Sequence, residues 1–139
     1  MIPPIRVVCR ISAVARACDD PLVATTVLIV DDHPSFRAIA RTVLAEGGYL
    51  VVGEAADTVS AIAAARRLHP ECVLLDIQLG DADGVAVADA LTNDGESPAI
   101  VLTSGRDPEE LEALTRASAA RGFIAKEKLS PATLGELLR

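Results

Sequence analysis

The sequence predicts a doubly wound α/β domain, in which a five-stranded parallel sheet is covered by five helices on its two faces. Two observations lead to this fold class. From Thr26 onward, short apolar runs alternate with longer amphipathic stretches. Half of the chain is apolar but only 2% is aromatic, so Val, Ile, Leu and Ala must build the core. That composition is typical of helices packed on a buried parallel sheet, and 139 residues suffice for one such domain.

Five apolar runs predict the strands. Each is short and continuous, as expected for a strand that is buried on both faces, and turn-forming residues separate it from the next amphipathic stretch. The runs cover residues 27–30, 50–52, 72–75, 99–102 and 122–125.

The stretches between and after these runs predict the helices, at residues 34–46, 58–68, 84–93, 108–119 and 131–138. Their ends carry the expected residues. Pro34 suits a first helical turn, and Gly47 follows the end of the first helix. Asp107 before Pro108, with Glu110 as the third helical residue, is a capping box, and Ser130 opens the last helix in a similar way.

Residues 1–25 differ from the rest of the chain. Arg6, Arg10 and Arg16 interrupt the apolar residues too often for a signal peptide. We expect a poorly ordered extension here, although a short amphipathic helix at a membrane surface or partner is the alternative. No run reaches the roughly 20 apolar residues of a membrane span. The domain itself is therefore predicted to cover residues 26–139.

Charge and cysteine content exclude several classes of function. Residues 26–139 hold ten basic and eighteen acidic side chains, a net charge of −8. Such an acidic domain is a poor non-specific binder of nucleic acid. Cys9, Cys18 and Cys72 form no metal-binding or disulfide pattern. Cys72 lies in an apolar run and is expected to be a small buried hydrophobe, and reduced thiols fit a cytoplasmic protein.

Polar residues follow four of the predicted strands. Asp31 and Asp32 follow the first, Asp76 the third, Thr103 the fourth and Lys126 the fifth. In parallel sheets ligands bind beyond these carboxyl ends. Crowded carboxylates need a cation, and Mg²⁺ prefers oxygen ligands while keeping water positions open for a phosphate. We therefore expect a Mg²⁺ site at this edge, where Lys126 and Thr103 would contact the phosphate.

The two histidines are interpreted more simply. His33 could be a base or a metal ligand, but it begins the first helix beside Pro34, which favours a role in the loop. His69 precedes Pro70 at a helix end and is expected to be a capping or surface residue.

Four segments resemble the receiver domain of two-component response regulators. They are residues 27–34 (VLIVDDHP), 73–79 (VLLDIQL, followed by Asp83-Gly84), 100–104 (IVLTS) and 122–126 (GFIAK). The resemblance runs from about Thr26 to Leu138 and implies the sheet order 2-1-3-4-5. Gly80 and Glu127 depart from it, because many members of the family have proline at both positions.

The resemblance also implies roles for single residues. Asp76 matches the phospho-accepting aspartate, and Asp32 matches the direct Mg²⁺ ligand with Asp31 as its acidic neighbour. The backbone carbonyl of Gln78 would be a further metal ligand. The switch hydroxyl and the phosphate-contacting lysine match Thr103 and Lys126, and the rotating aromatic of the fifth strand matches Phe123.

The implied function is signalling. A histidine kinase or phosphotransfer protein would phosphorylate Asp76, and a downstream protein would bind the surface of the fourth helix, fifth strand and fifth helix. The resemblance allows a homodimer. The DDHP sequence resembles the subgroup that usually carries a C-terminal LuxR-type helix-turn-helix. Because the sequence ends at Arg139, we expect no direct binding of DNA by this chain.

Two other functions share parts of this pattern. A Mg²⁺-dependent phosphohydrolase that forms an aspartyl-phosphate would need a second carboxylate two residues after the nucleophile, where this chain has Gln78. A flavin-binding module would need a phosphate-binding loop after the first strand, where Asp31 and Asp32 would repel the phosphate. We therefore predict a phospho-acceptor domain rather than an enzyme. Gln78 and Gly105 are expected to flank the path of the water that removes the phosphate.

Overall fold

The structure is a computed structural model, and it describes residues 24–79, 82–92, 98–105, 108–116 and 118–138. The predicted extension at residues 1–25 lies outside this part of the chain, except for its last two residues. A parallel five-stranded sheet forms the centre, in the order β3-β2-β4-β7-β8. Since these are the second, first, third, fourth and fifth strands of the alternating pattern, the predicted order 2-1-3-4-5 is confirmed.

Every predicted strand and helix is present. The strands of the main sheet are β2 (Thr26–Val30), β3 (Leu50–Ala55), β4 (Cys72–Asp76), β7 (Ala99–Ser104) and β8 (Gly122–Ala125). The helices are α1 (Pro34–Glu46), α2 (Thr58–Leu68), α3 (Gly84–Thr92), α4 (Pro108–Arg116) and α5 (Pro131–Leu138). Strands β3 and β7 run beyond the apolar runs that predicted them, because the residues that follow each run continue the pairing with the neighbouring strands.

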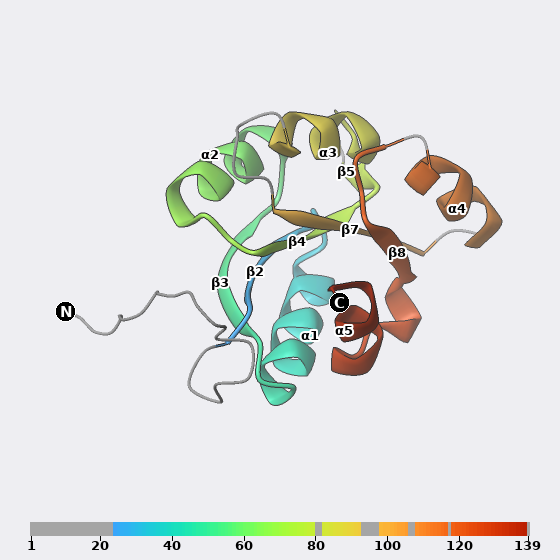
Figure 1. Cartoon of the computed structure of the whole chain (residues 1–139). Coiled ribbons are helices and arrows are strands. Elements are labelled where there is room, and N and C mark those ends of the chain that lie inside the picture. The colour runs from blue at the N-terminus through green and yellow to red at the C-terminus, as the bar shows by residue number, and fades with distance from the viewer. Residues whose placement is uncertain (1–23, 80–81, 93–97, 106–107, 117, 139) are drawn as a thin grey trace.

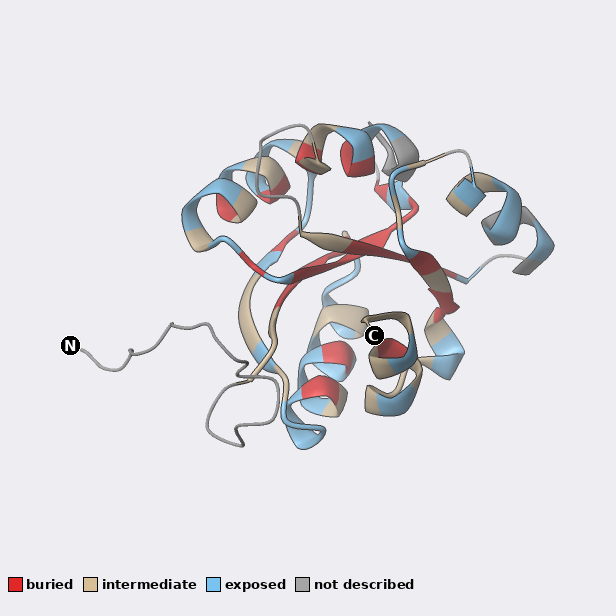
Figure 2. Cartoon of the chain, in the orientation of Figure 1, coloured by how far each residue is buried: buried red, intermediate tan, exposed pale blue. Residues whose placement is uncertain are grey.

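The helices cover the sheet in two layers (Figure 1): α1 and α5 pack on one face, and α2, α3 and α4 on the other. Alternate residues of each strand enter opposite cores, as Val27 and Leu28 of β2 illustrate. The buried residues therefore concentrate in the central strands and on the inner sides of the helices (Figure 2). This arrangement explains why the strands are continuous apolar runs rather than alternating patterns.

The helix ends follow the sequence expectations closely. Helix α1 ends at Gly47, and Gly48 has a φ of 90°, a conformation that favours glycine. His69 caps the end of α2 with a φ of 47°, which confirms its capping role. The Ser130 side chain accepts a hydrogen bond from the backbone N–H of Thr133 at the start of α5. Asp107, the predicted cap of α4, lies outside the described residues.

The structure departs from the sequence predictions in three places. The helix predicted over 108–119 ends at Arg116, because the hydroxyl of Ser118 donates to the carbonyl of Thr115 and closes a turn. A short hairpin, β5 (Gln78–Leu79) and β6 (Ala82–Asp83), follows β4. A single 3₁₀ turn, η1 (Lys126–Lys128), follows β8. Among the described residues, no helix is long and apolar enough to cross a membrane.

Candidate functional site

The carboxyl ends of four parallel strands bring the predicted site residues together. Asp31 and Asp32 follow β2, and Asp76 is the last residue of β4. Thr103 pairs with Asp76 across the β4–β7 register, so the two residues are neighbours. Lys126 follows β8, and its ammonium nitrogen reaches both Asp31 and Asp76. The convergence that the sequence predicted at this edge of the sheet is therefore present in the structure.

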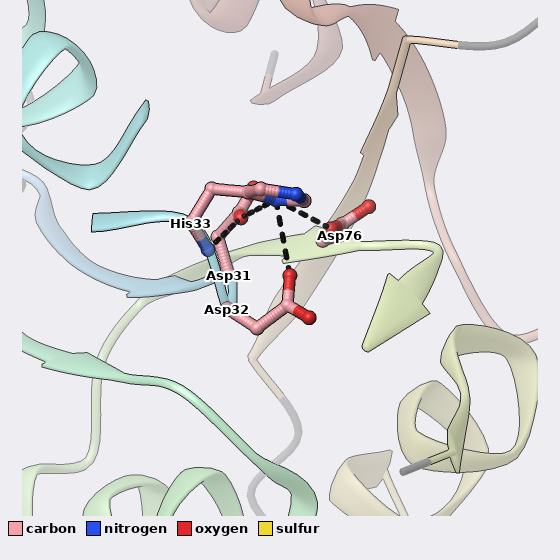
Figure 3. A group of neighbouring side chains, drawn as sticks. All are labelled: Asp31, Asp32, His33 and Asp76. Atoms are coloured by element: carbon pink, nitrogen blue, oxygen red, sulfur yellow. Dashed lines mark hydrogen bonds and ion pairs between the residues drawn. The ribbon is translucent and has the colours of Figure 1, made fainter. Parts of the chain in front are cut away.

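Three carboxylates surround one imidazole nitrogen (Figure 3). The Nδ1 atom of His33 lies 2.9 Å from Oδ1 of Asp31, 3.0 Å from Oδ1 of Asp32 and 3.9 Å from Oδ2 of Asp76. His33 lies in the loop before α1, as expected, and it is the N-cap residue of that helix. Its ring nevertheless lies among the acids, where the base or metal ligand considered in the sequence analysis would lie. Its backbone N–H also donates to Oδ1 of Asp31, at 2.8 Å, and this turn holds the Asp31 carboxylate in place.

Lys126 lies on another side of the acids. Its Nζ atom is 2.8 Å from Oδ2 of Asp31 and 3.5 Å from Oδ2 of Asp76. The same ammonium lies 4.7 Å from the centre of the Phe36 ring. Since only 20% of the Lys126 side chain is exposed, its charge is partly shielded from water and acts strongly on both carboxylates.

Asp76 is the most chemically unusual residue of the cluster. It is 2% exposed, and this burial raises the pKa of its carboxyl group above the ordinary value. The neighbouring charge of Asp31 adds to the rise in pKa, whereas the Lys126 ammonium and a hydrogen bond from the Gln78 backbone N–H oppose it. A buried carboxylate in such surroundings gains from any further positive charge that binds beside it.

Three buried polar atoms of the site have no hydrogen-bond partner among the described residues: Oδ2 of Asp31, Oδ1 of Asp32 and Oγ1 of Thr103. Oδ2 of Asp31 is ion-paired with the Lys126 ammonium at 2.8 Å, and Oδ1 of Asp32 lies 3.0 Å from Nδ1 of His33. A buried hydroxyl such as that of Thr103 costs about 1–3 kcal/mol when it is left without a partner. Polar atoms at adjacent strand ends that lack hydrogen bonds within the fold indicate a place where a ligand completes the bonding.

These residues fit a divalent cation. One ligand atom from each of Asp31, Asp32, His33 and Asp76 lies within 4.8 Å of all the others. The oxygens of Asp31 and Asp32 that lack a hydrogen bond can bind a cation, and three carboxylates favour a hard ion such as Mg²⁺. The backbone of Gln78 lies next to Asp76, to whose Oδ1 its N–H donates at 3.1 Å. The predicted oxygen ligands are thus all at this edge of the sheet.

The remaining predicted residues lie on or beside β5, β7 and β8. Phe123 is half-buried on β8 and packs against the core under α2, α3 and α4. The side chain of Gln78 is exposed at the start of β5. Among the described residues, a β-carbon built on Gly105 would meet no atom within 4 Å, so the described part of the chain leaves space beside the end of β7. Gly80 lies outside the described residues.

Two residues of α1 that the sequence analysis did not single out also contact the site. The Nη1 atom of Arg37 donates to the backbone carbonyl of Asp31 at 2.6 Å, and its Nε donates to Glu54 on β3. Phe36 lies beneath the Lys126 ammonium. Both residues occupy the first turn after the acid pair, and Phe36 is one of only two phenylalanines in the chain. Their position directly after the acid pair, and the scarcity of phenylalanine in the chain, are the features from which a role at the site could have been inferred.

Comparison with known proteins identifies the family. The model of the response regulator receiver domain family matches residues 27–139. The nitrate/nitrite response regulator protein NarP of Escherichia coli is 36% identical over 115 residues, which cover 81% of this chain and 53% of NarP.

 Two solved structures have a similar fold. The signal receiver domain of the response regulator NarL from Mycobacterium tuberculosis has a TM-score of 0.72 and is 28% identical, with 82% of this chain and 96% of that chain covered. A LuxR-family two-component response regulator from Aurantimonas has a TM-score of 0.70 at 25% identity, with 82% of this chain and 81% of that chain covered.

The chain spans about half the length of the first curated relatives it matches, 52% and 49% of them. The family match covers well over half of the chain, from the first residue of the first apolar run to the last helix. The chain belongs to the response regulator receiver domain family.

Proposed function

We propose that this domain receives a phosphoryl group on Asp76 and passes on a signal through the resulting change of conformation. The observation that supports this most strongly is the setting of Asp76. Its carboxylate is almost fully buried at a strand end, with an ammonium 3.5 Å away and two further carboxylates close by. A nucleophile held in this way meets a phosphoryl group in a site that already holds positive charge.

The transfer step makes one bond and breaks one. An oxygen of the Asp76 carboxylate forms a bond to phosphorus, while the bond between phosphorus and the donor breaks and the donor keeps the electron pair. For a phosphohistidine of a kinase or phosphotransfer protein, that leaving atom is an imidazole nitrogen. Lys126 stabilises the negative charge on the phosphoryl oxygens during the transfer. The unpaired hydroxyl of Thr103 can then donate to one of them.

Mg²⁺ is the proposed cofactor. Asp31, Asp32, Asp76 and the backbone carbonyl of Gln78 would hold it, and it would supply further positive charge beside the phosphoryl oxygens. The cluster of ligand atoms from Asp31, Asp32 and Asp76, together with the oxygens of Asp31 and Asp32 that lack a hydrogen bond, supports this assignment.

The switch and its output are also proposals. Once Thr103 turns toward the phosphoryl group, Phe123 on the neighbouring strand can rotate inward, and the surface of α4, β8 and α5 changes its population of conformations. A downstream protein, or a second copy of this chain, would bind that surface. The cytoplasm is the expected compartment.

A phosphohydrolase is the alternative. It would need a general acid and base beside the nucleophile, and the side chain two residues after Asp76 is the amide of Gln78. An amide can orient water but cannot take its proton. We therefore expect a phosphorylated form that persists, rather than rapid turnover of phosphate esters.

Phosphorylation by acetyl phosphate with Mg²⁺ tests the proposal. Intact-mass measurement should show one added phosphate on the wild-type chain and none on Asp76→Asn. Asp89→Asn is the matched control, because Asp89 is an exposed aspartate on α3 whose hydrogen bond to the backbone of Ala119 an amide oxygen can keep. Equal labelling of Asp76→Asn and the wild type would show that the acceptor lies elsewhere.

A further inference from the structure

We propose that Phe36 is a positioning residue for phosphoryl transfer, whose ring holds the Lys126 ammonium beside Asp76. The inference rests on the proposed function. It adds a residue of α1 that would act only through the Lys126 ammonium and would bind neither the phosphoryl group nor Mg²⁺. It follows from three features of the structure: where the ring is fixed, what lies over it, and what competes for the ammonium.

The Phe36 ring is held in place from one side. Phe36 lies in the first turn of α1, which begins directly after the acid pair. It is half-buried and packs against the core that α1 and α5 form with the sheet. A ring packed in this way presents a fixed surface to whatever lies beyond it.

The Lys126 ammonium lies beyond that surface. Its nitrogen is 4.7 Å from the ring centre, which is within the range of about 6 Å over which a cation is attracted to an aromatic ring. The Lys126 side chain is only 20% exposed, and partial removal from water strengthens this attraction.

The ring matters because two carboxylates compete for the ammonium. Nζ of Lys126 is closer to Asp31, at 2.8 Å, than to Asp76, at 3.5 Å. The flexible four-carbon side chain of lysine has many conformations, so two acids alone fix it poorly. A third contact on the ring restricts the ammonium to a position from which it reaches Asp76. Positioning before the reaction lowers the barrier of the transfer.

The position of the ammonium can be observed directly, because Lys126 and Lys128 are the only lysines of the chain. Selective ¹³C labelling of lysine in a tag-free protein gives one set of Cε–Hε signals for each. A ring below the side chain should shift the Lys126 Hε signals upfield of those of exposed Lys128. Phe36→Leu should remove most of that shift and leave Lys128 unchanged.

Kinetics test the consequence. Phe36→Leu should slow phosphorylation by acetyl phosphate about fivefold, the size expected for one partly shielded cation–ring contact. Phe36→Tyr keeps the ring and should restore the wild-type rate. A change in packing alone would slow the reaction in any background. We instead expect Phe36→Leu to have no further effect in a Lys126→Met chain, because the ammonium that the ring positions is gone.

Several results would overturn the proposal. These are a wild-type Lys126 signal without an upfield shift, a Phe36→Leu rate equal to that of the wild type, and a Phe36→Tyr rate as slow as that of Phe36→Leu. Circular dichroism checks that the variants fold, and Phe36→Met, another apolar residue without a ring, replaces Phe36→Leu if that variant does not. Labelling that survives Asp76→Asn would refute the proposed function instead, so the two failures are distinguishable.

Discussion

The two ends of the central sheet differ in how their polar groups are hydrogen-bonded. At the amino ends of β2 and β4, Thr26 and the neighbouring Glu71 satisfy each other. The Thr26 backbone N–H donates to Oε1 of Glu71 at 3.1 Å, and the Glu71 backbone N–H donates to Oγ1 of Thr26 at 2.9 Å. At the carboxyl ends, three buried atoms of Asp31, Asp32 and Thr103 have no hydrogen-bond partner in the part of the chain that the structure describes.

The two ends also differ in the surroundings of their ionisable side chains, as Cys72 and Asp76 of β4 illustrate. Cys72 lies at the amino end of β4, where burial raises the pKa of its thiol to about 12. The thiol therefore stays protonated and unreactive at neutral pH, as expected of a small buried hydrophobe. Asp76 lies at the other end of the same strand. There burial and the charge of Asp31 raise the pKa of its carboxyl group, and Lys126 lowers it. The amino end of the sheet satisfies its polar groups within the fold, whereas the carboxyl end leaves several of the described polar atoms without a hydrogen bond.

The largest expected effect is on phosphorylation, and it distinguishes a residue of the proposed site from a residue that stabilises the fold. Asp32→Ala should lower phosphorylation by acetyl phosphate at least about a hundredfold, because it removes a proposed cation ligand. The fold should be equally stable or more stable, since the substitution relieves repulsion among carboxylates. Asp57→Ala is the contrasting variant: Asp57 caps α2 through the Ser60 backbone N–H, so its loss should lower the melting temperature and leave phosphorylation unchanged. Equal labelling of Asp32→Ala and the wild type would remove Asp32 from the site.

Gly105 tests the open space beside the end of β7. A side chain at this position meets no atom within 4 Å at its β-carbon, so arginine can be introduced without a clash there. Gly105→Arg should slow loss of the phosphate up to about tenfold, or roughly 1.4 kcal/mol of barrier, by blocking the approach of water. Phosphorylation by small donors should be slowed less. The measurement follows phosphate on the purified phospho-protein after the donor is removed, and equal or faster decay than in the wild type would contradict the prediction.

The pKa of Asp76 predicts how the carboxyl end affects stability as pH changes. The folded chain binds the Asp76 proton more tightly than the unfolded chain does, because burial raises the pKa. Its contribution to stability is therefore most favourable below the pKa of the unfolded state and is lost as pH rises through the folded pKa. In chelator, Asp76→Asn should be more stable than the wild type at pH 7, and this difference should shrink as the pH is lowered toward 4. Urea unfolding across that range checks it, and a difference that grows toward low pH would contradict the sign.

Much of the fold could be predicted from the sequence, because apolar runs and helix-end residues are both local features of the chain. Continuous apolar runs predicted the strands, and residues such as Pro34 and Gly47 marked the helix ends. The strand ends then placed Asp31, Asp76 and Lys126 at one edge, since parallel strands all end on the same side.

The features that could not be predicted depend on side-chain direction. The sequence indicated that His33 begins a helix, but not that its ring nitrogen lies 2.9 Å from Asp31. Likewise, nothing in the spacing of Phe36 and Lys126 shows that the ammonium lies over the ring. The hairpin of β5 and β6 depends on a pairing of only two residues in each strand, which is too short for a pattern to predict.

The smallest expected effect is on the free energy of unfolding, when threonine is replaced by valine at each end of the sheet. Thr103→Val replaces a buried hydroxyl that has no partner, so it should stabilise the fold by about 1 kcal/mol. Thr26→Val removes the acceptor of the Glu71 backbone N–H, and because that end is partly exposed to water the loss should be smaller, about 0.5 kcal/mol of destabilisation. Urea unfolding of both variants beside the wild type, in chelator at pH 7, measures the two differences. Opposite signs would support the contrast between the ends. Destabilisation by both substitutions would mean that the Thr103 hydroxyl is already satisfied in the folded chain and is not held in reserve for a phosphoryl oxygen.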